Sequence, residues 1–248
     1  GEWEGISAEF NYGVPMTMIG VDGNAYIGLK LSVEPVEDNL TCIYSVGRYE
    51  ESAEAEVLYF TDSFPFDSGD LTTTLRKSLF GYTCAADKNG NVYFAPLSSE
   101  EYHIVVFSPE GDTLLEISRD VERIAKSEEE IRLEKEWVET LIGGSGSGSQ
   151  VVEYNPDPYR DMIADIGVDS DGRIWVRRGT VLSPVFDVYD SSGKFLFCVE
   201  VPTIGDEAQF WDFVIDEYGI IAYPENPEYY SKIYLLELSG VLKDTPRR

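Results

Sequence analysis

The sequence is poor in histidine, cysteine and basic residues, and each shortage excludes a class of protein. Its one imidazole, that of His103, is too few for a multi-histidine zinc site or a pair of catalytic histidines. The 19 Lys and Arg stand against 46 Asp and Glu, a formal net charge of −27, and a surface of this sign repels the phosphates of nucleic acids. No apolar run reaches the roughly 18 residues of a membrane-spanning helix. We therefore expect neither a nucleic-acid partner nor a transmembrane segment.

The cysteines Cys42, Cys84 and Cys198 lie in apolar stretches and lack the CxxC spacing of metal and redox sites, so we interpret them as small buried residues. The chain has 248 residues, of which 43% are hydrophobic and 13% aromatic, enough to bury the core of one large domain or two small ones. It begins with Gly1 and not with methionine, from which we expect a processed or trimmed protein.

Four segments share one local pattern, in which an apolar residue and an aspartate lead into a turn with glycine, followed by alternating apolar residues. The aspartate side chain is suited to bind turn amides and the glycine tolerates positive φ, so each segment predicts a β-hairpin. The segments are VDGNAYI (21–27), ADKNGNVYF (86–94), VDSDGRIWV (168–176) and IDEYGIIAY (215–223).

In three of the four units a second glycine turn follows 21 residues after the first, at Gly111, Gly193 and Gly240. Two hairpins make a four-stranded antiparallel sheet, and a series of such sheets predicts an all-β fold, a single β-propeller domain over residues 1–248. The first unit is the least regular, and its strands extend toward EVLYFTD (56–62). The last unit lacks a fourth strand, which we expect residues 5–10 to supply.

Residues 119–150 form a helical insertion in this scheme. Ser127 followed by Glu128, Glu129 and Glu130 is a capping box, and the one-sided apolar residues after it predict a helix of about 14 residues. Packing of this helix on the propeller and docking of a partner both stay open. A Gly/Ser tether follows at 143–149, and its composition fits a natural flexible loop or an engineered one.

The repeats resemble those of bacterial six-bladed β-propellers of the NHL and TolB-like kind. The resemblance covers most of residues 80–240, although four units are recognisable where the family pattern has six. It implies the fold and a location outside the cytoplasm, but little about chemistry, because this architecture hosts enzymes, receptors and scaffolds. The stretches that carry it are AADKNGNVYFAP, YHIVVFSPEGDTLLEI, KSEEEIRLEKEW, GVDSDGRIWVRRG and FDVYDSSGKFLFCVEV.

In a propeller the first strand of each sheet lines the central channel, so a ligand site is expected just upstream of the hairpin aspartates. Asp165 and Asp212 stand at equivalent positions, four residues before those aspartates, and Met18 and Thr83 are their counterparts in the other units. Two carboxylates from neighbouring strands are candidate ligands for Ca²⁺. Solvated carboxylates at the channel mouth and strand-end caps are the alternatives.

Two further pairs are candidate ligand-binding residues. Arg177 and Arg178 are adjacent in a predicted strand, so alternation directs one inward and the other outward. Either is suited to bind an anionic group or to pair with a buried carboxylate such as Asp165. Tyr229 and Tyr230 lie in a proline-containing loop, where tyrosines stack on sugars or peptides or pack between sheets.

These features support two functional hypotheses. The preferred one is a non-catalytic binding protein outside the cytoplasm, which engages a peptide, glycan or protein partner and needs no cofactor. The alternative is a metal-dependent hydrolase of the lactonase type, in which channel carboxylates hold a divalent cation. No catalytic residue is identified, because His103 lacks a recognisable nucleophile and orienting acid.

Overall fold

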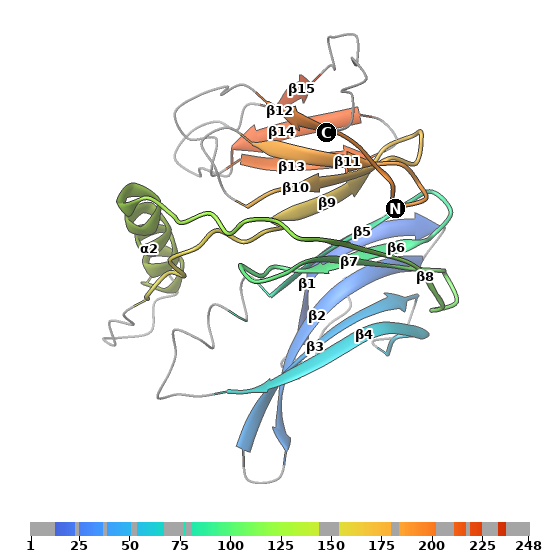
Figure 1. The fold of residues 1–248 in the computed structure, drawn as a ribbon. Coiled ribbons are helices and arrows are strands. Elements are labelled where there is room, and N and C mark those ends of the chain that lie inside the picture. The colour runs from blue at the N-terminus through green and yellow to red at the C-terminus, as the bar shows by residue number, and fades with distance from the viewer. Residues whose placement is uncertain are drawn as a thin grey trace. The chain divides into compact units, whose positions relative to one another are not determined.

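The structure is a computed structural model and describes residues 13–22, 25–36, 39–50, 54–66, 77, 81–143, 154–179, 184–201, 211–216, 219–224 and 233–236. This part of the chain is mostly β, and its strands form four antiparallel sheets of three or four strands (Figure 1). Two compact units divide the chain. Unit 1 comprises residues 1–80 and 132–156, and unit 2 comprises residues 81–131 and 157–248.

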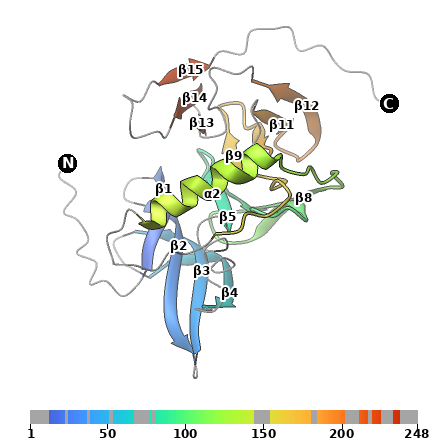
Figure 2. The same cartoon turned by 90° about the vertical axis from the view of Figure 1, so that its left-hand side faces the viewer.

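Unit 1 contains one four-stranded antiparallel meander. Its strands are 9 to 12 residues long, and β2 and β3 run together as an extended hairpin in both views (Figures 1 and 2). Ile27, Tyr44 and Val46 are fully buried in this sheet. The expectation that a strand crosses 56–62 is confirmed. The strands are β1 (Gly13–Asp22), β2 (Ala25–Val36), β3 (Asn39–Tyr49) and β4 (Val57–Pro65).

Unit 2 contains three consecutive antiparallel sheets, each a meander in chain order. The first strands of these sheets are neighbours, because β5 contacts β9 and β9 contacts β13. The first sheet has β5 (Tyr82–Ala86), β6 (Val92–Pro96), β7 (Tyr102–Phe107) and β8 (Thr113–Arg119). The second has β9 (Asp165–Val168), β10 (Ile174–Arg177), β11 (Val185–Tyr189) and β12 (Phe195–Glu200). The third has β13 (Trp211–Asp216), β14 (Gly219–Pro224) and β15 (Tyr234–Leu236).

The predicted turns of the first and second sheets of unit 2 are confirmed. Asp87 and Asp169 each use one carboxylate oxygen to accept the backbone N–H groups two and four residues later, which closes the first hairpin of each sheet. The glycines of the first and second hairpins, 21 residues apart, share a positive φ that favours glycine. The φ angles are 79° at Gly90, 96° at Gly111, 74° at Gly172 and 80° at Gly193.

Apolar side chains fill the spaces between neighbouring sheets of unit 2. One core cluster joins the first and second sheets and includes the fully buried Ile104 and Ile174. A second cluster joins the second and third sheets, where the ring of Phe186 meets that of Phe213 edge-on at 5.3 Å. Gly167 of β9 permits this approach, because a Cβ at that position would lie 2.5 Å from the Cβ of Ile215 in β13.

The helix α2 (Glu128–Gly143) begins where the capping box predicts and is 16 residues long, two more than expected. Ser127 donates its N–H to Glu130 Oε2 at 2.8 Å, and its Oγ accepts the N–H of Glu130 at 3.2 Å. Arg160 pairs with Glu130 at 2.8 Å, and the Tyr154 hydroxyl donates to Glu134 at 2.9 Å. Residues beyond the Gly/Ser stretch therefore return to the helix.

No helix in the described ranges combines the length and the apolar character needed to cross a bilayer.

The sheets that the repeats predict are thus present in unit 2, while their closure into a propeller stays a prediction. The expected closing strand at residues 5–10, the tether residues 144–149 and the turn glycines Gly23 and Gly240 lie outside the described residues.

Candidate functional site

Three polar side chains lie near the starts of the first strands of unit 2. Thr83 of β5, Asp165 of β9 and Asp212 of β13 occupy the equivalent positions derived from the repeats. The Thr83 hydroxyl donates to Asp165 Oδ1 at 3.0 Å, and the charge of Asp212 acts on Asp165. Neighbouring first strands therefore bring together residues that are more than 40 positions apart in sequence. Their fourth counterpart, the Met18 side chain, lies outside the described residues.

Arg177 joins these residues from the adjacent strand. It is the residue opposite Asp165 in the β9–β10 ladder, and only 8% of its surface is exposed. Its guanidinium lies 5.0 Å from the centre of the Phe213 ring, a cation–π contact. Burial lowers the pKa of Arg177, and the charges of Asp165 and Asp212 oppose that effect. The positive charge of Arg177 thus interacts with both carboxylates. This inward position opposite Asp165 is the one that strand alternation allows for one arginine of the pair.

Asp165 titrates in an unusual range because of its surroundings. Burial raises the pKa of its carboxyl to about 6, and the negative charge of Asp212 adds to this effect. Hydrogen bonds from the Ile166 N–H, at 2.8 Å, and from Thr83 oppose it, as does the charge of Arg177. A carboxyl group with such a pKa changes its charge just below neutral pH.

Cys84 lies next to Thr83 in β5 and is buried. Burial raises the pKa of its thiol to about 12, with a further contribution from the charge of Asp165. The thiol therefore stays protonated at neutral pH, and a protonated thiol is a poor nucleophile and metal ligand.

The expected Ca²⁺ site at Asp165 and Asp212 stays a prediction. Calcium takes about six to eight oxygen ligands, whereas the cluster offers two carboxylates and one hydroxyl. Within the described ranges, no group of three or more His, Cys, Asp or Glu side chains is placed to hold a metal ion.

Arg178 points away from Arg177, as strand alternation predicts, and belongs to a different set of contacts. Its Nε and Nη2 donate to the two carboxylate oxygens of Asp187 at 3.0 and 2.8 Å. Asp187 is fully buried and also pairs with Arg119 at 2.9 Å. Sequence reasoning missed Asp187 as a partner, although an acidic residue inside the apolar stretch FDVY was a usable signal.

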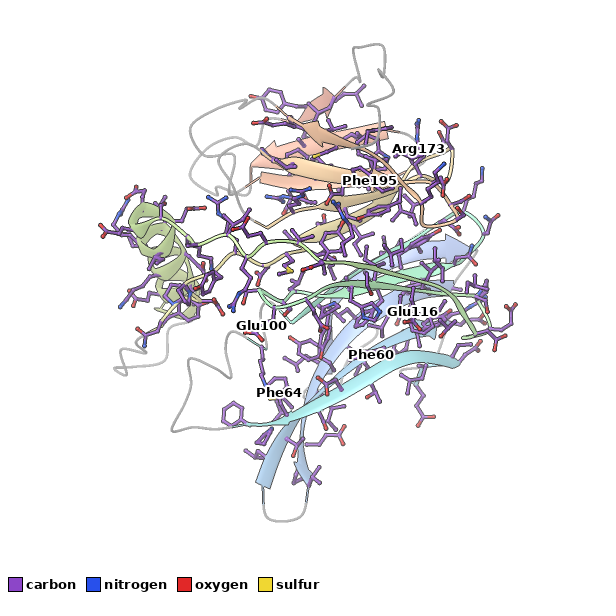
Figure 3. All side chains as sticks on the ribbon, in the orientation of Figure 1. Phe60, Phe64, Glu100, Glu116, Arg173 and Phe195 are labelled. Atoms are coloured by element: carbon purple, nitrogen blue, oxygen red, sulfur yellow. The ribbon has the colours of Figure 1, made fainter. Side chains whose placement is uncertain are left out.

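The remaining candidate residues are Tyr229, Tyr230 and His103. Tyr229 and Tyr230 lie outside the described residues. His103 is partly exposed on β7, and its Nε2 lies 3.4 Å from Glu116 of β8, the residue labelled in Figure 3. This cross-strand pair on the first sheet of unit 2 is the contact expected of a structural histidine.

A scan of the chain against protein-family models finds no match, and a search of the curated proteins finds no similar sequence. The resemblance to NHL and TolB-like propellers consequently stays a prediction that rests on the repeats quoted above.

Proposed function

We propose that this chain is a non-catalytic binding protein of propeller architecture, and that its ligand site is the polar cluster of Thr83, Asp165, Arg177 and Asp212. The observation that carries the proposal is that Thr83 binds Asp165, that Arg177 stands opposite Asp165, and that β13, which carries Asp212, contacts β9. The charge of Asp212 acts on both Asp165 and Arg177. Propellers bind ligands at the ends of their first strands. Side-by-side first strands in three consecutive sheets support that architecture.

The chemistry of the cluster favours recognition over catalysis. Thr83 donates a hydrogen bond to Asp165, and the neighbouring Cys84 thiol stays protonated at neutral pH and is a poor nucleophile. Arg177 lies over the Phe213 ring, and its charge interacts with those of Asp165 and Asp212. Such fixed, mutually paired groups are suited to hold the complementary groups of a ligand in place.

The charge of the cluster indicates the class of ligand. Two carboxylates and one guanidinium leave a net charge near −1 when Asp165 is ionised, on a chain whose net charge is −27. A field of this sign concentrates cations and steers basic groups toward the site. The proposed partner is therefore a peptide or protein segment with a basic side chain. Glycan binding and a location outside the cytoplasm remain predictions from the sequence.

The proposal is tested by titrating the full chain with short lysine-containing, neutral and glutamate-containing peptides, and with a neutral oligosaccharide. We expect the lysine peptide to bind most tightly. Asp212→Asn should weaken this binding about 10-fold, the value of one charge-assisted hydrogen bond. Asp171→Asn is the matched control, because the Asp171 carboxylate is 68% exposed and pairs with Arg173. Equal affinity of all peptides, or equal loss in both variants, would refute the proposal.

The hydrolase alternative relies on the same two carboxylates, Asp165 and Asp212, whose charges interact. It predicts that a chelator lowers the melting temperature, since a metal bound to the folded state alone stabilises it. An unchanged melting temperature, together with no hydrolysis of a lactone substrate, eliminates this alternative.

A further inference from the structure

A second group of charged side chains lies in unit 2, apart from the proposed site. Asp187 of β11 is at its centre and has no exposed surface. Its carboxylate accepts hydrogen bonds from Arg178 and from the Tyr102 hydroxyl, the latter at 3.2 Å, and pairs with Arg119. The Tyr189 hydroxyl donates to that of Tyr102 at 2.9 Å. These five residues, from the first and second sheets, are called the Asp187 cluster.

The Asp187 cluster has one positive charge in excess. Arginine stays protonated in proteins, so Arg119 and Arg178 contribute two charges. Asp187 is the one carboxylate within ion-pair distance of either guanidinium in the part of the chain that the structure describes. The excess charge is accessible, because each arginine side chain is 30% exposed. A net positive site is notable on a chain with a net charge of −27.

Both guanidinium groups are held in fixed orientations. Arg178 binds Asp187 through two nitrogens, in the bidentate geometry that arginine favours. Arg119 lies between two aromatic rings, 4.6 Å from the centre of Phe195 and 5.7 Å from that of Tyr102. Groups held in this way lose little conformational entropy when a ligand binds.

The guanidinium groups retain donors for such a ligand. Each guanidinium has five N–H bonds. Asp187 and the Tyr189 hydroxyl use Nη1 of Arg119, and Asp187 uses Nε and Nη2 of Arg178. Within the described residues, the other nitrogens of these two arginines make no hydrogen bond. Phe195, 41% exposed on β12, adds an apolar surface beside Arg119 (Figure 3).

We propose that the Asp187 cluster is an oxyanion-binding site. Arg119 and Arg178 bind a carboxylate or phosphate group through their outward N–H bonds, and Phe195 contacts the apolar part of the ligand. Asp187, Tyr102 and Tyr189 position the two arginines and leave the excess charge for the anion. This site differs from the proposed peptide site in its residues, its charge and its ligand, so each proposal can fail alone.

The test uses the full chain at low ionic strength and follows the arginine side-chain Nε–H signals by NMR. Inorganic phosphate, acetate and benzoate are titrated separately, with sodium chloride as the control for ionic strength. We expect saturable shifts of the Arg119 and Arg178 signals with at least one oxyanion. Comparison of phosphate with acetate shows whether the site binds a phosphate or a carboxylate group. Tighter binding of benzoate than of acetate would demonstrate the contact with Phe195.

Variants assign the effect to the cluster. Arg178→Gln should weaken oxyanion binding about 10-fold or more, while Asp187 keeps Arg119 as its partner. Arg123→Gln is the matched control, because Arg123 stacks on Tyr159 at 3.9 Å and pairs one-to-one with Glu100. If Arg178→Gln does not fold, the titration of the wild-type protein with oxyanions and with chloride still tests the proposal. Shifts no larger than those with chloride, or equal losses in Arg178→Gln and Arg123→Gln, would overturn it.

Discussion

Replacement of Asp187 by asparagine should destabilise unit 2 more than any surface substitution. The variant retains the shape of the side chain but removes the one carboxylate that Arg119 and Arg178 share. Removing one partner of a buried ion pair costs about 3–5 kcal/mol, because a desolvated charge remains. Each arginine side chain is 30% exposed, and water screens part of its charge. We therefore expect the low end of this range, about 3 kcal/mol.

The assay is calorimetric melting of the full chain at neutral pH. For chains of this size 1 kcal/mol corresponds to a shift of about 2–4 °C, so Asp187→Asn should lower the melting temperature of unit 2 by about 6–12 °C. Asp171→Asn is the control, because its ion pair with Arg173 is exposed, and such pairs contribute about 0–1 kcal/mol. Equal shifts of the melting temperature in the two variants would show that the buried charge of Asp187 does not contribute to the stability of unit 2.

Three further predictions concern packing, capping and pH. Gly167→Ala should lower the stability of unit 2 by about 1–3 kcal/mol, measured by urea unfolding, because the new Cβ would lie 2.8 Å from the Ile215 carbonyl oxygen. Ser127→Ala should cost about 1 kcal/mol and speed amide exchange in the first turn of α2, since Glu130 loses its capping partner. The pKa of Asp165 rises on folding from 3.8 to about 6, so the folded state binds this proton more tightly. That stabilisation is complete below pH 4 and is lost as the pH rises through 6, a difference of up to about 3 kcal/mol that Asp165→Asn should remove.

The local features of this fold were predictable because they depend on residues close in sequence. An aspartate and a glycine three positions apart, such as Asp87 and Gly90, define a turn by their own hydrogen bonds and backbone angles. The capping box of α2 is equally local. The sequence also offered Asp165 as a partner of one arginine of the Arg177–Arg178 pair, and Arg177 stands opposite Asp165 in one hairpin whose register its turn determines.

The Asp187 cluster was not predictable in the same way. Arg119 and Asp187 come from different sheets, and their contact depends on how the first and second sheets of unit 2 pack together. Phe195 lies beside Arg119 because of the same packing.

The hydrophobic pattern also does not determine the length of a strand. β2 and β3 continue for 12 and 11 residues because each supplies the hydrogen-bonding partner of the other, which the repeat pattern does not reveal.

The first strands of unit 2 place Asp165 and Asp212 close enough for their charges to interact. Titration of the Asp165 carboxyl carbon by NMR, in the wild type and in Asp212→Asn, measures this interaction most directly. We expect a pKa near 6 in the wild type and a lower pKa in the variant, because the negative charge of Asp212 contributes to the raised value. An Asp165 pKa that is the same in both proteins would show that the two carboxylates do not interact.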